Sequence, residues 1–145
     1  MSVEAGLELG LCATPQEVMR GCEALREFCM AQGVPAATLY DTMLAFEEVG
    51  TNIVEHGYHS NPQGRLSLRA DRTREAIRLE ICDEADAFNP LELPAPNPRT
   101  GAEAPERGLG VHIIRAIVAS AEYSRDEGRN RLVLTLRLGA GGSEA

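Results

Sequence analysis

Two stretches near the N-terminus place apolar residues at steps of three and four, which is the spacing of one face of a helix. The first opens with the capping signature Thr14-Pro15-Gln16-Glu17 and stops at Gln32-Gly33. The second starts at Pro35 and should end near Gly57. Their apolar stripes are Val18, Cys22, Leu25 and Cys29 in the first, and Leu39, Met43, Phe46 and Ile53 in the second, with Gly50 at a further apolar position. The spacing therefore predicts two consecutive helices.

The apolar period then changes to two, the period of a strand with one buried face. This pattern predicts two hairpins, whose strands cover Arg65–Ala70, Ile77–Ile81, Ala121–Arg125 and Leu132–Leu138. A further strand, Leu7–Cys12, is expected at the edge of the sheet. Strands with one polar face predict a sheet that is covered by helices on one side and open to water on the other. The expected fold class is α/β, a two-layer α/β sandwich with a mixed, mostly antiparallel sheet and helices on one face.

Between the hairpins lies a stretch without clear periodicity, Asn89 to Glu106, which contains five of the eight prolines. Loops longer than about 12–15 residues in a compact domain are usually lids or disordered segments, so a mobile lid is expected at about 89–107. A third helix is predicted from Gly108 to about Ser120. Residues 1–138 are expected to form a single domain, and residues 139–145 a flexible tail.

Composition narrows the functional classes. The 145 residues include 14 basic and 22 acidic side chains, which give a net charge of −8 and disfavour direct nucleic-acid binding. No apolar run approaches the about 20 residues of a membrane-spanning helix, and the N-terminus lacks the pattern of a signal peptide. The four cysteines lack zinc-ligand spacing and are expected to be reduced. We therefore expect a cytoplasmic protein that contacts neither membranes nor nucleic acid directly.

Three short patterns are candidates for chemistry. Glu48 and Asn52 are four residues apart in the second predicted helix, so a carboxylate and an amide share one face. Asp83 closes a predicted strand, where a carboxylate can accept a hydrogen bond from the amine of a base. Gly108-Leu109-Gly110 opens the third predicted helix, where backbone N–H groups and the positive helix end suit a phosphate. Each pattern alone is also typical of a solvated helix face, a strand-ending turn or a plain helix entry.

In their order and spacing, the three patterns resemble the motifs of the GHKL (Bergerat-fold) ATPases, and among these the small anti-sigma-factor serine-protein kinases. Phe46–Tyr58 is similar to the N-box of that family, including the closing His-Gly-Tyr. Asp83–Pro90 resembles its adenine-binding box, and Glu106–Ile114 its second glycine box. Tyr123-Ser124-Arg125 and Gly128–Leu132 are similar to its closing segments. The resemblance covers most of residues 7–138 and implies the Bergerat ATP-binding fold.

The resemblance also implies a role for each motif residue. Asn52 would hold Mg²⁺ through its amide oxygen, and Asp83 would accept the adenine amino group. Glu48 would be the catalytic base for a serine hydroxyl of a partner protein, while its competitor Glu47 lies about 100° around the helix. Arg107 would point toward the γ-phosphate from the lid. The other residues implied to bind the nucleotide are Ala85, Phe88, Gly108, Leu109, Gly110 and Val111.

One departure from the family pattern concerns the adenine-binding box. The family usually has glycine where Ala85 and Ala87 stand. Alanine removes the cheapest route to a positive φ beside the adenine, which predicts weaker nucleotide binding.

The resemblance implies an ATP- and Mg²⁺-dependent serine kinase that phosphorylates an anti-sigma-factor antagonist and, when free of it, binds a sigma factor, as a homodimer. The alternative is an ATP-binding interaction module that captures its partner without phosphorylating it. Retention of Glu48 and Asn52 favours the kinase, whereas Ala85 favours the module. A severed histidine-kinase catalytic domain is less favoured, because the lid is short and the N-box ends in His-Gly-Tyr.

Overall fold

A computed structural model of the chain describes residues 6–87, 89 and 114–139. The elements in chain order are β1 (Leu7–Cys12), α1 (Pro15–Ala31), α2 (Ala36–Asn52), the π-helix η1 (Ile53–Gly57), β2 (Arg65–Arg72), β3 (Ala76–Asp83), β4 (Ser120–Asp126) and β5 (Arg129–Arg137). Both predicted N-terminal helices and both predicted hairpins are confirmed. In the described ranges no helix is both long enough and apolar enough to span a membrane.

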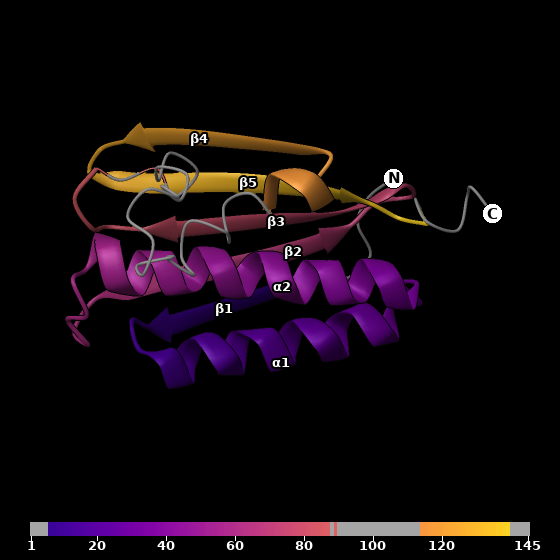
Figure 1. Ribbon diagram of the computed structural model, residues 1–145, viewed down its shortest axis with the longest axis horizontal. Helices are drawn as coiled ribbons and strands as arrows, with labels where there is room; N and C mark the ends of the chain where they lie inside the picture. Colours follow the sequence, from indigo (N-terminus) through magenta and orange to yellow (C-terminus); the bar gives the residue numbers. More distant parts are fainter. Residues whose placement is uncertain (1–5, 88, 90–113, 140–145) are drawn as a thin grey trace, which may run out of the picture.

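The five strands form one sheet in the order β1-β2-β3-β5-β4 (Figure 1). All four pairings between these strands are antiparallel, so the described strands use none of the parallel pairing that a mixed sheet allows. β1 lies at one edge, as predicted, and β4 lies at the other. The central register places Leu68 opposite Ile81 and Ile81 opposite Leu132, so the apolar positions of three strands fall on one face.

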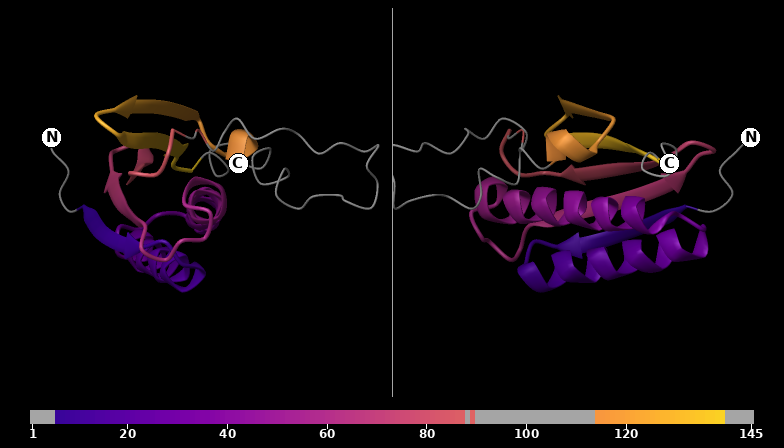
Figure 2. Two further views of the ribbon diagram at one scale, coloured as in Figure 1. Left: turned by 90° about the vertical axis from the view of Figure 1, so that its left-hand side faces the viewer. Right: turned by 45° about the vertical axis from the view of Figure 1, so that its right-hand side comes forward.

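Helices α1 and α2 cover that apolar face, and the other face of the sheet carries no described helix (Figure 2). The burial pattern follows the strand period, since Leu66, Leu68 and Ala70 of β2 are buried while Arg65 and Arg69 are exposed. This confirms the predicted two-layer α/β sandwich. The physical reason is that a strand with one apolar face must pack that face against another layer.

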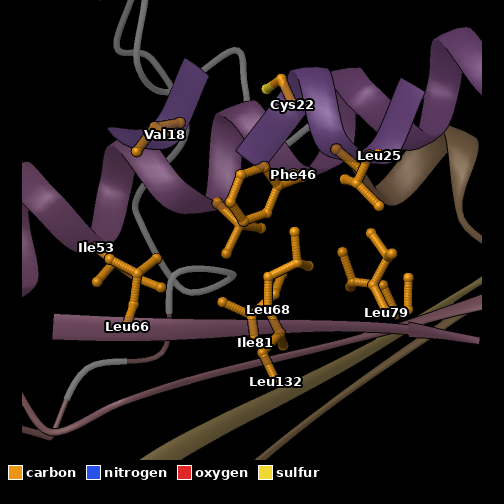
Figure 3. Close-up of a cluster of buried hydrophobic side chains, with 14 of the residues drawn as sticks. Val18, Cys22, Leu25, Phe46, Ile53, Leu66, Leu68, Leu79, Ile81 and Leu132 are labelled. Atoms are coloured by element: carbon orange, nitrogen blue, oxygen red, sulfur yellow. The ribbon is translucent and has the colours of Figure 1, made fainter. Parts of the chain in front are cut away.

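Phe46 of α2 is the centre of the core and is fully buried. Its ring lies between the helices and the strand residues below, such as Leu68 (Figure 3). The ring reaches α1 at Gly21, where a Cβ atom would lie 2.7 Å from the Phe46 ring. At Gly50 a Cβ atom would lie 3.2 Å from a methyl group of Val18. Glycine at these two positions therefore lets α1 and α2 approach each other closely.

The predicted start of α1 agrees with the structure, whereas the predicted end of the third helix does not. Thr14 caps α1, as predicted, and its hydroxyl accepts a hydrogen bond of 3.1 Å from the amide of Glu17. The third helix was predicted to run to about Ser120, which is wrong. Its described part covers Ile114–Ile117. The helix ends there because the amide of Ala119 donates a hydrogen bond to the carbonyl of Thr135 in the sheet.

The four cysteines are free thiols. Burial raises the pKa of Cys22 to about 12 and that of Cys29 to about 11. A thiol with such a pKa carries almost no thiolate near neutral pH and is therefore unreactive. Both residues lie on the face of α1 that packs against the core.

Candidate functional site

The described candidate residues come from three elements that meet at one end of the sandwich. In Figure 1 the C-terminal end of α2 lies at the same side as the tip of β3 and the start of β5. The strand register agrees, because Asp83 at the end of β3 pairs with Leu66 near the start of β2 and with Asn130 near the start of β5. Segments that are far apart in the chain therefore frame one site.

Glu48 and Asn52 lie on α2, four residues apart, so both side chains project from one face of that helix. Glu48 is half-buried, whereas its neighbour Glu47 is exposed. Asn52 is 2% exposed, and its Nδ2 has no hydrogen-bond partner among the described residues. A buried amide without a partner costs free energy unless a ligand completes its hydrogen bonds.

The helix changes type directly after Asn52. The α-helical pattern ends there, and η1 continues as a π-helix over Ile53–Gly57, so the predicted helical extent to Gly57 is confirmed but its last turn is wider. His59 and Ser60 then have positive φ angles of 53° and 64° in the turn that leads to β2. Short π-helical segments are frequent at functional sites, because they redirect neighbouring side chains.

Asp83 is 5% exposed and is held by two hydrogen bonds on one carboxylate oxygen. Its Oδ1 accepts from the amide of Ala85 at 2.9 Å and from Nδ2 of Asn130 at 2.8 Å. Burial raises the pKa of Asp83, and these two hydrogen bonds oppose that shift. Within the described part of the chain, Oδ2 is the oxygen left to accept a hydrogen bond from a ligand.

Asn130 of β5 organises the turn that follows Asp83. Besides its bond to Asp83, its Nδ2 donates to the carbonyl oxygens of Ala85 at 3.3 Å and Asp86 at 3.1 Å. Its Oδ1 accepts from the guanidinium of Arg125 at 2.9 Å and from the hydroxyl of Tyr123. Arg125 also donates to the carbonyl of Ala85 at 3.1 Å. The β4–β5 hairpin thus fixes the turn that follows Asp83 from one side.

Sequence reasoning gave no role to Asn130, Tyr123 or Arg125, although their segments entered the family resemblance. The available signal was strand parity. Asn130 is an even number of residues from the buried leucines of β5, so it lies on the same, core-facing side of the strand as Leu132, Leu134 and Leu136. Asp83 likewise lies on the same side of β3 as Ile81. A polar side chain at a core-facing position needs a buried partner, and these positions supply one another with partners.

The substitution of glycine by alanine in the adenine-binding box causes no backbone strain. Among the described residues, the positions other than glycine with positive φ are His59, Ser60 and Glu127. Ala85 and Ala87 are therefore outside the region that favours glycine. The turn of this chain thus uses no positive φ at either alanine, and the weaker nucleotide binding expected from the two alanines stays a prediction.

The remaining candidate residues lie outside the described residues. They are Phe88, Arg107, Gly108, Leu109, Gly110 and Val111, together with the lid from residue 90 onward. The described candidate residues are therefore Glu48, Asn52, Asp83 and Ala85.

A comparison with protein families shows which family the chain belongs to. A family model described as a histidine kinase-like ATPase domain matches residues 11–136, which includes every element from α1 to β4 and most of β5. The chain belongs to this family. Membership implies that the domain uses ATP.

Two curated relatives of this ATPase domain are protein kinases. Over 93 residues it is 30% identical to the serine/threonine-protein kinase BtrW of Bordetella bronchiseptica, which covers 63% of this chain and 66% of that kinase. Over 93 residues it is 24% identical to the serine-protein kinase RsbW of Bacillus licheniformis, which covers 61% of this chain and 58% of that kinase. The match therefore spans less than two thirds of the length of either kinase.

Solved structures share the fold of the ATPase domain. The RsbU and RsbW domains of a Mycobacterium tuberculosis protein match with a TM-score of 0.68 and 22% identity, covering 93% of this chain and 33% of that chain. A chain of the SiaB–SiaC complex of Pseudomonas aeruginosa matches with a TM-score of 0.66 and 13% identity, covering 90% of this chain and 88% of that chain. At these identities the likeness shows the fold alone.

The residues present fit an adenine nucleotide with a divalent cation. Asp83 is an anchored carboxylate with an acceptor to offer. Asn52 is a buried amide whose Nδ2 has no hydrogen-bond partner among the described residues, and its amide oxygen is the atom that could bind a divalent cation. In the described ranges no three His, Cys, Asp or Glu side chains gather as a metal cage. Mg²⁺ at phosphate sites commonly uses only one or two side chains together with the phosphates themselves, so a single amide ligand is compatible with it.

Proposed function

We propose that this chain is an ATP- and Mg²⁺-dependent protein serine kinase of a partner-switching circuit. It phosphorylates an anti-sigma-factor antagonist and, when free of it, binds a sigma factor. The observation that carries the proposal is the placement of Glu48 and Asn52 on one face of α2, at the end of the sheet where Asp83 is fixed. The kinase names of BtrW and RsbW support a protein hydroxyl as the phosphate acceptor.

The proposed roles follow from the chemistry of the side chains. Oδ2 of Asp83 accepts a hydrogen bond from the adenine amino group, while Oδ1 keeps its hydrogen bonds from the amide of Ala85 and from Asn130. Asn52 holds Mg²⁺, which would neutralise phosphate charge when bound. Glu48, one helical turn away, accepts the proton of a serine hydroxyl as its oxygen attacks the γ-phosphorus and ADP leaves. The motif residues Arg107, Gly108, Leu109, Gly110 and Val111 are assigned to the phosphates, and Ala85 and Phe88 to the adenine side, from the family resemblance.

The test compares two neighbouring glutamates. Glu48→Gln keeps the size of the side chain but removes the base, so phosphate transfer from labelled ATP to the antagonist-like protein encoded beside the gene should fall by about 10²–10⁴-fold. Affinity for ADP should stay within about twofold, because Glu48 is not needed to hold adenine or metal. Glu47→Gln is the matched control, since Glu47 is exposed on α2, and it should transfer phosphate at the wild-type rate.

The outcomes separate the competing functions. If Glu47→Gln loses transfer and Glu48→Gln keeps it, the base has been assigned to the wrong carboxylate. If the wild type binds ATP and its partner protein but transfers no phosphate to serine, the interaction module is the correct function.

The proposal includes a homodimer, which rests on the family resemblance. Two copies of the chain would present their faces to one sigma factor. Light scattering at tens of micromolar, with and without nucleotide, should give twice the 15.6 kDa mass of the chain. A monomer mass under both conditions would remove the dimer from the proposal.

A further inference from the structure

Tyr58 joins two segments of the site through a single hydroxyl group. Its phenol oxygen accepts a hydrogen bond of 2.8 Å from the amide of Glu84 and donates one of 2.6 Å to the carbonyl of Arg65. A phenol has one donor and can also accept, so both bonds can form at once. Glu84 directly follows Asp83, and Tyr58 directly follows the π-helix that begins after Asn52.

The hydroxyl stands where the β2–β3 ladder would continue. The last pair in the register is Leu66 with Asp83, so the next pair would be Arg65 with Glu84. Tyr58 lies between the carbonyl of one and the amide of the other, in place of a direct ladder bond. The backbone therefore leaves the sheet at Glu84 with its amide satisfied, and this fixes where the turn behind Asp83 begins.

The ring of Tyr58 is itself held on both sides. Its backbone amide donates to the carbonyl of Ile53 at 2.9 Å, which ties it to η1. The ring packs onto Gly64, where a Cβ atom would lie 2.5 Å from two ring carbons. Gly64 is fixed in turn, because its carbonyl accepts from the amide of Ala13 at 2.9 Å and its amide donates to Asn61 at 3.0 Å. Only glycine at this position leaves room for the ring.

The protonation state of the phenol agrees with its role as a donor. Burial raises the pKa of Tyr58, and the charges of Asp83 and Glu84 act in the same direction. The phenol therefore stays protonated at neutral pH and keeps its hydrogen bond to the Arg65 carbonyl.

We propose that Tyr58 is a positioning residue that sets the Asp83–Glu84 turn for the adenine base, from the side opposite to Asn130. This inference rests on the proposed nucleotide-binding function. Asn130 holds the turn at Ala85 and Asp86, and Tyr58 holds it at Glu84, so the base-reading carboxylate is fixed between two anchors. Tyr58 is also bonded to Ile53, so the same residue contacts the segment after Asn52 and the turn after Asp83.

The test removes only the hydroxyl. Tyr58→Phe keeps the ring on Gly64, and Tyr40→Phe removes the same group from a tyrosine of α2 that is 64% exposed. In the nucleotide-free protein, exchange of the Glu84 amide should become about tenfold faster in Tyr58→Phe and stay unchanged in Tyr40→Phe. By calorimetry, ADP affinity should fall about five- to tenfold, and the preference for ADP over GDP should shrink, with a nearly unchanged Tm.

A second variant tests the same bridge without touching the tyrosine. Gly64→Ala should push the ring away and reproduce the loss of ADP preference, although the hydroxyl is still present. An ADP affinity and an ADP-to-GDP ratio equal to the wild type in Tyr58→Phe would overturn the positioning role. If the wild type binds neither ADP nor GDP, the proposed nucleotide-binding function is wrong. In that case the Tyr58 bridge is still tested by amide exchange, because an unchanged exchange rate of the Glu84 amide in Tyr58→Phe would overturn it.

Discussion

Replacing Asp83 with asparagine tests the two oxygens of its carboxylate separately. The asparagine Oδ1 can accept the same hydrogen bonds from the amide of Ala85 and from Asn130, at 2.9 and 2.8 Å in the wild type. The second oxygen becomes an NH₂ group, so an acceptor is replaced by a donor at the position left for a ligand. The change therefore preserves the internal network of the turn and alters only what the turn offers to a base.

The size of the effect follows from the group that is lost. A hydrogen bond to a charged acceptor contributes about 1.5–3 kcal/mol, and in Asp83→Asn the adenine amino group would also face another donor. A loss of about 2–3 kcal/mol in ADP binding corresponds to about a 30- to 150-fold weaker affinity. Guanine carries an acceptor at the equivalent position, so GDP binding should stay unchanged or improve.

Calorimetric titration of wild type and Asp83→Asn with ADP and GDP is the decisive assay. Asp86→Asn is the matched control, because Asp86 is exposed and interacts with Asn130 through its backbone carbonyl, which the substitution keeps. Burial raises the pKa of Asp83, so removing its charge should leave the Tm of the free protein equal or higher. Equal weakening of ADP and GDP, or wild-type ADP affinity in Asp83→Asn, would refute the assignment of Asp83 as the base-reading residue.

Two further predictions concern stability. Burial raises the pKa of Asp83 above its ordinary value of 3.8, so the stability linked to its protonation is fully present below that value and is lost as the pH rises through the folded-state pKa. In urea unfolding from about pH 4 to neutral pH, the wild type should therefore lose stability relative to Asp83→Asn. A constant difference over this range would contradict the raised pKa. Phe46→Ala should lower the free energy of unfolding by about 3–5 kcal/mol, because Phe46 is fully buried between both helices and the sheet, and a loss below about 1 kcal/mol would show that the core does not depend on this ring.

Local order along the chain determined most of the elements. The stripe from Val18 to Cys29 predicted α1, and alternation from Arg65 to Ile81 predicted the first hairpin, because helix and strand periods report which side of an element is buried. The spacing of Glu48 and Asn52 placed both on one helix face by geometry alone. Asp83 was predicted as a candidate binding residue from its place at the end of a strand.

Only the tertiary structure decided how these elements meet. The bond between Asn130 and Asp83 joins residues 47 positions apart, and that between Tyr58 and Glu84 joins residues 26 positions apart. The third helix ends at Ile117 because the amide of Ala119 donates a hydrogen bond to Thr135 of the sheet. The spacing of apolar residues in the helix does not predict this bond. Periodicity reports the burial of a position, whereas the partner of a buried polar group depends on strand register and on the path of the chain between elements. The sequence by itself therefore determined the layers, the strands and the candidate residues, and the fold decided which side chains hold the adenine-binding turn in place.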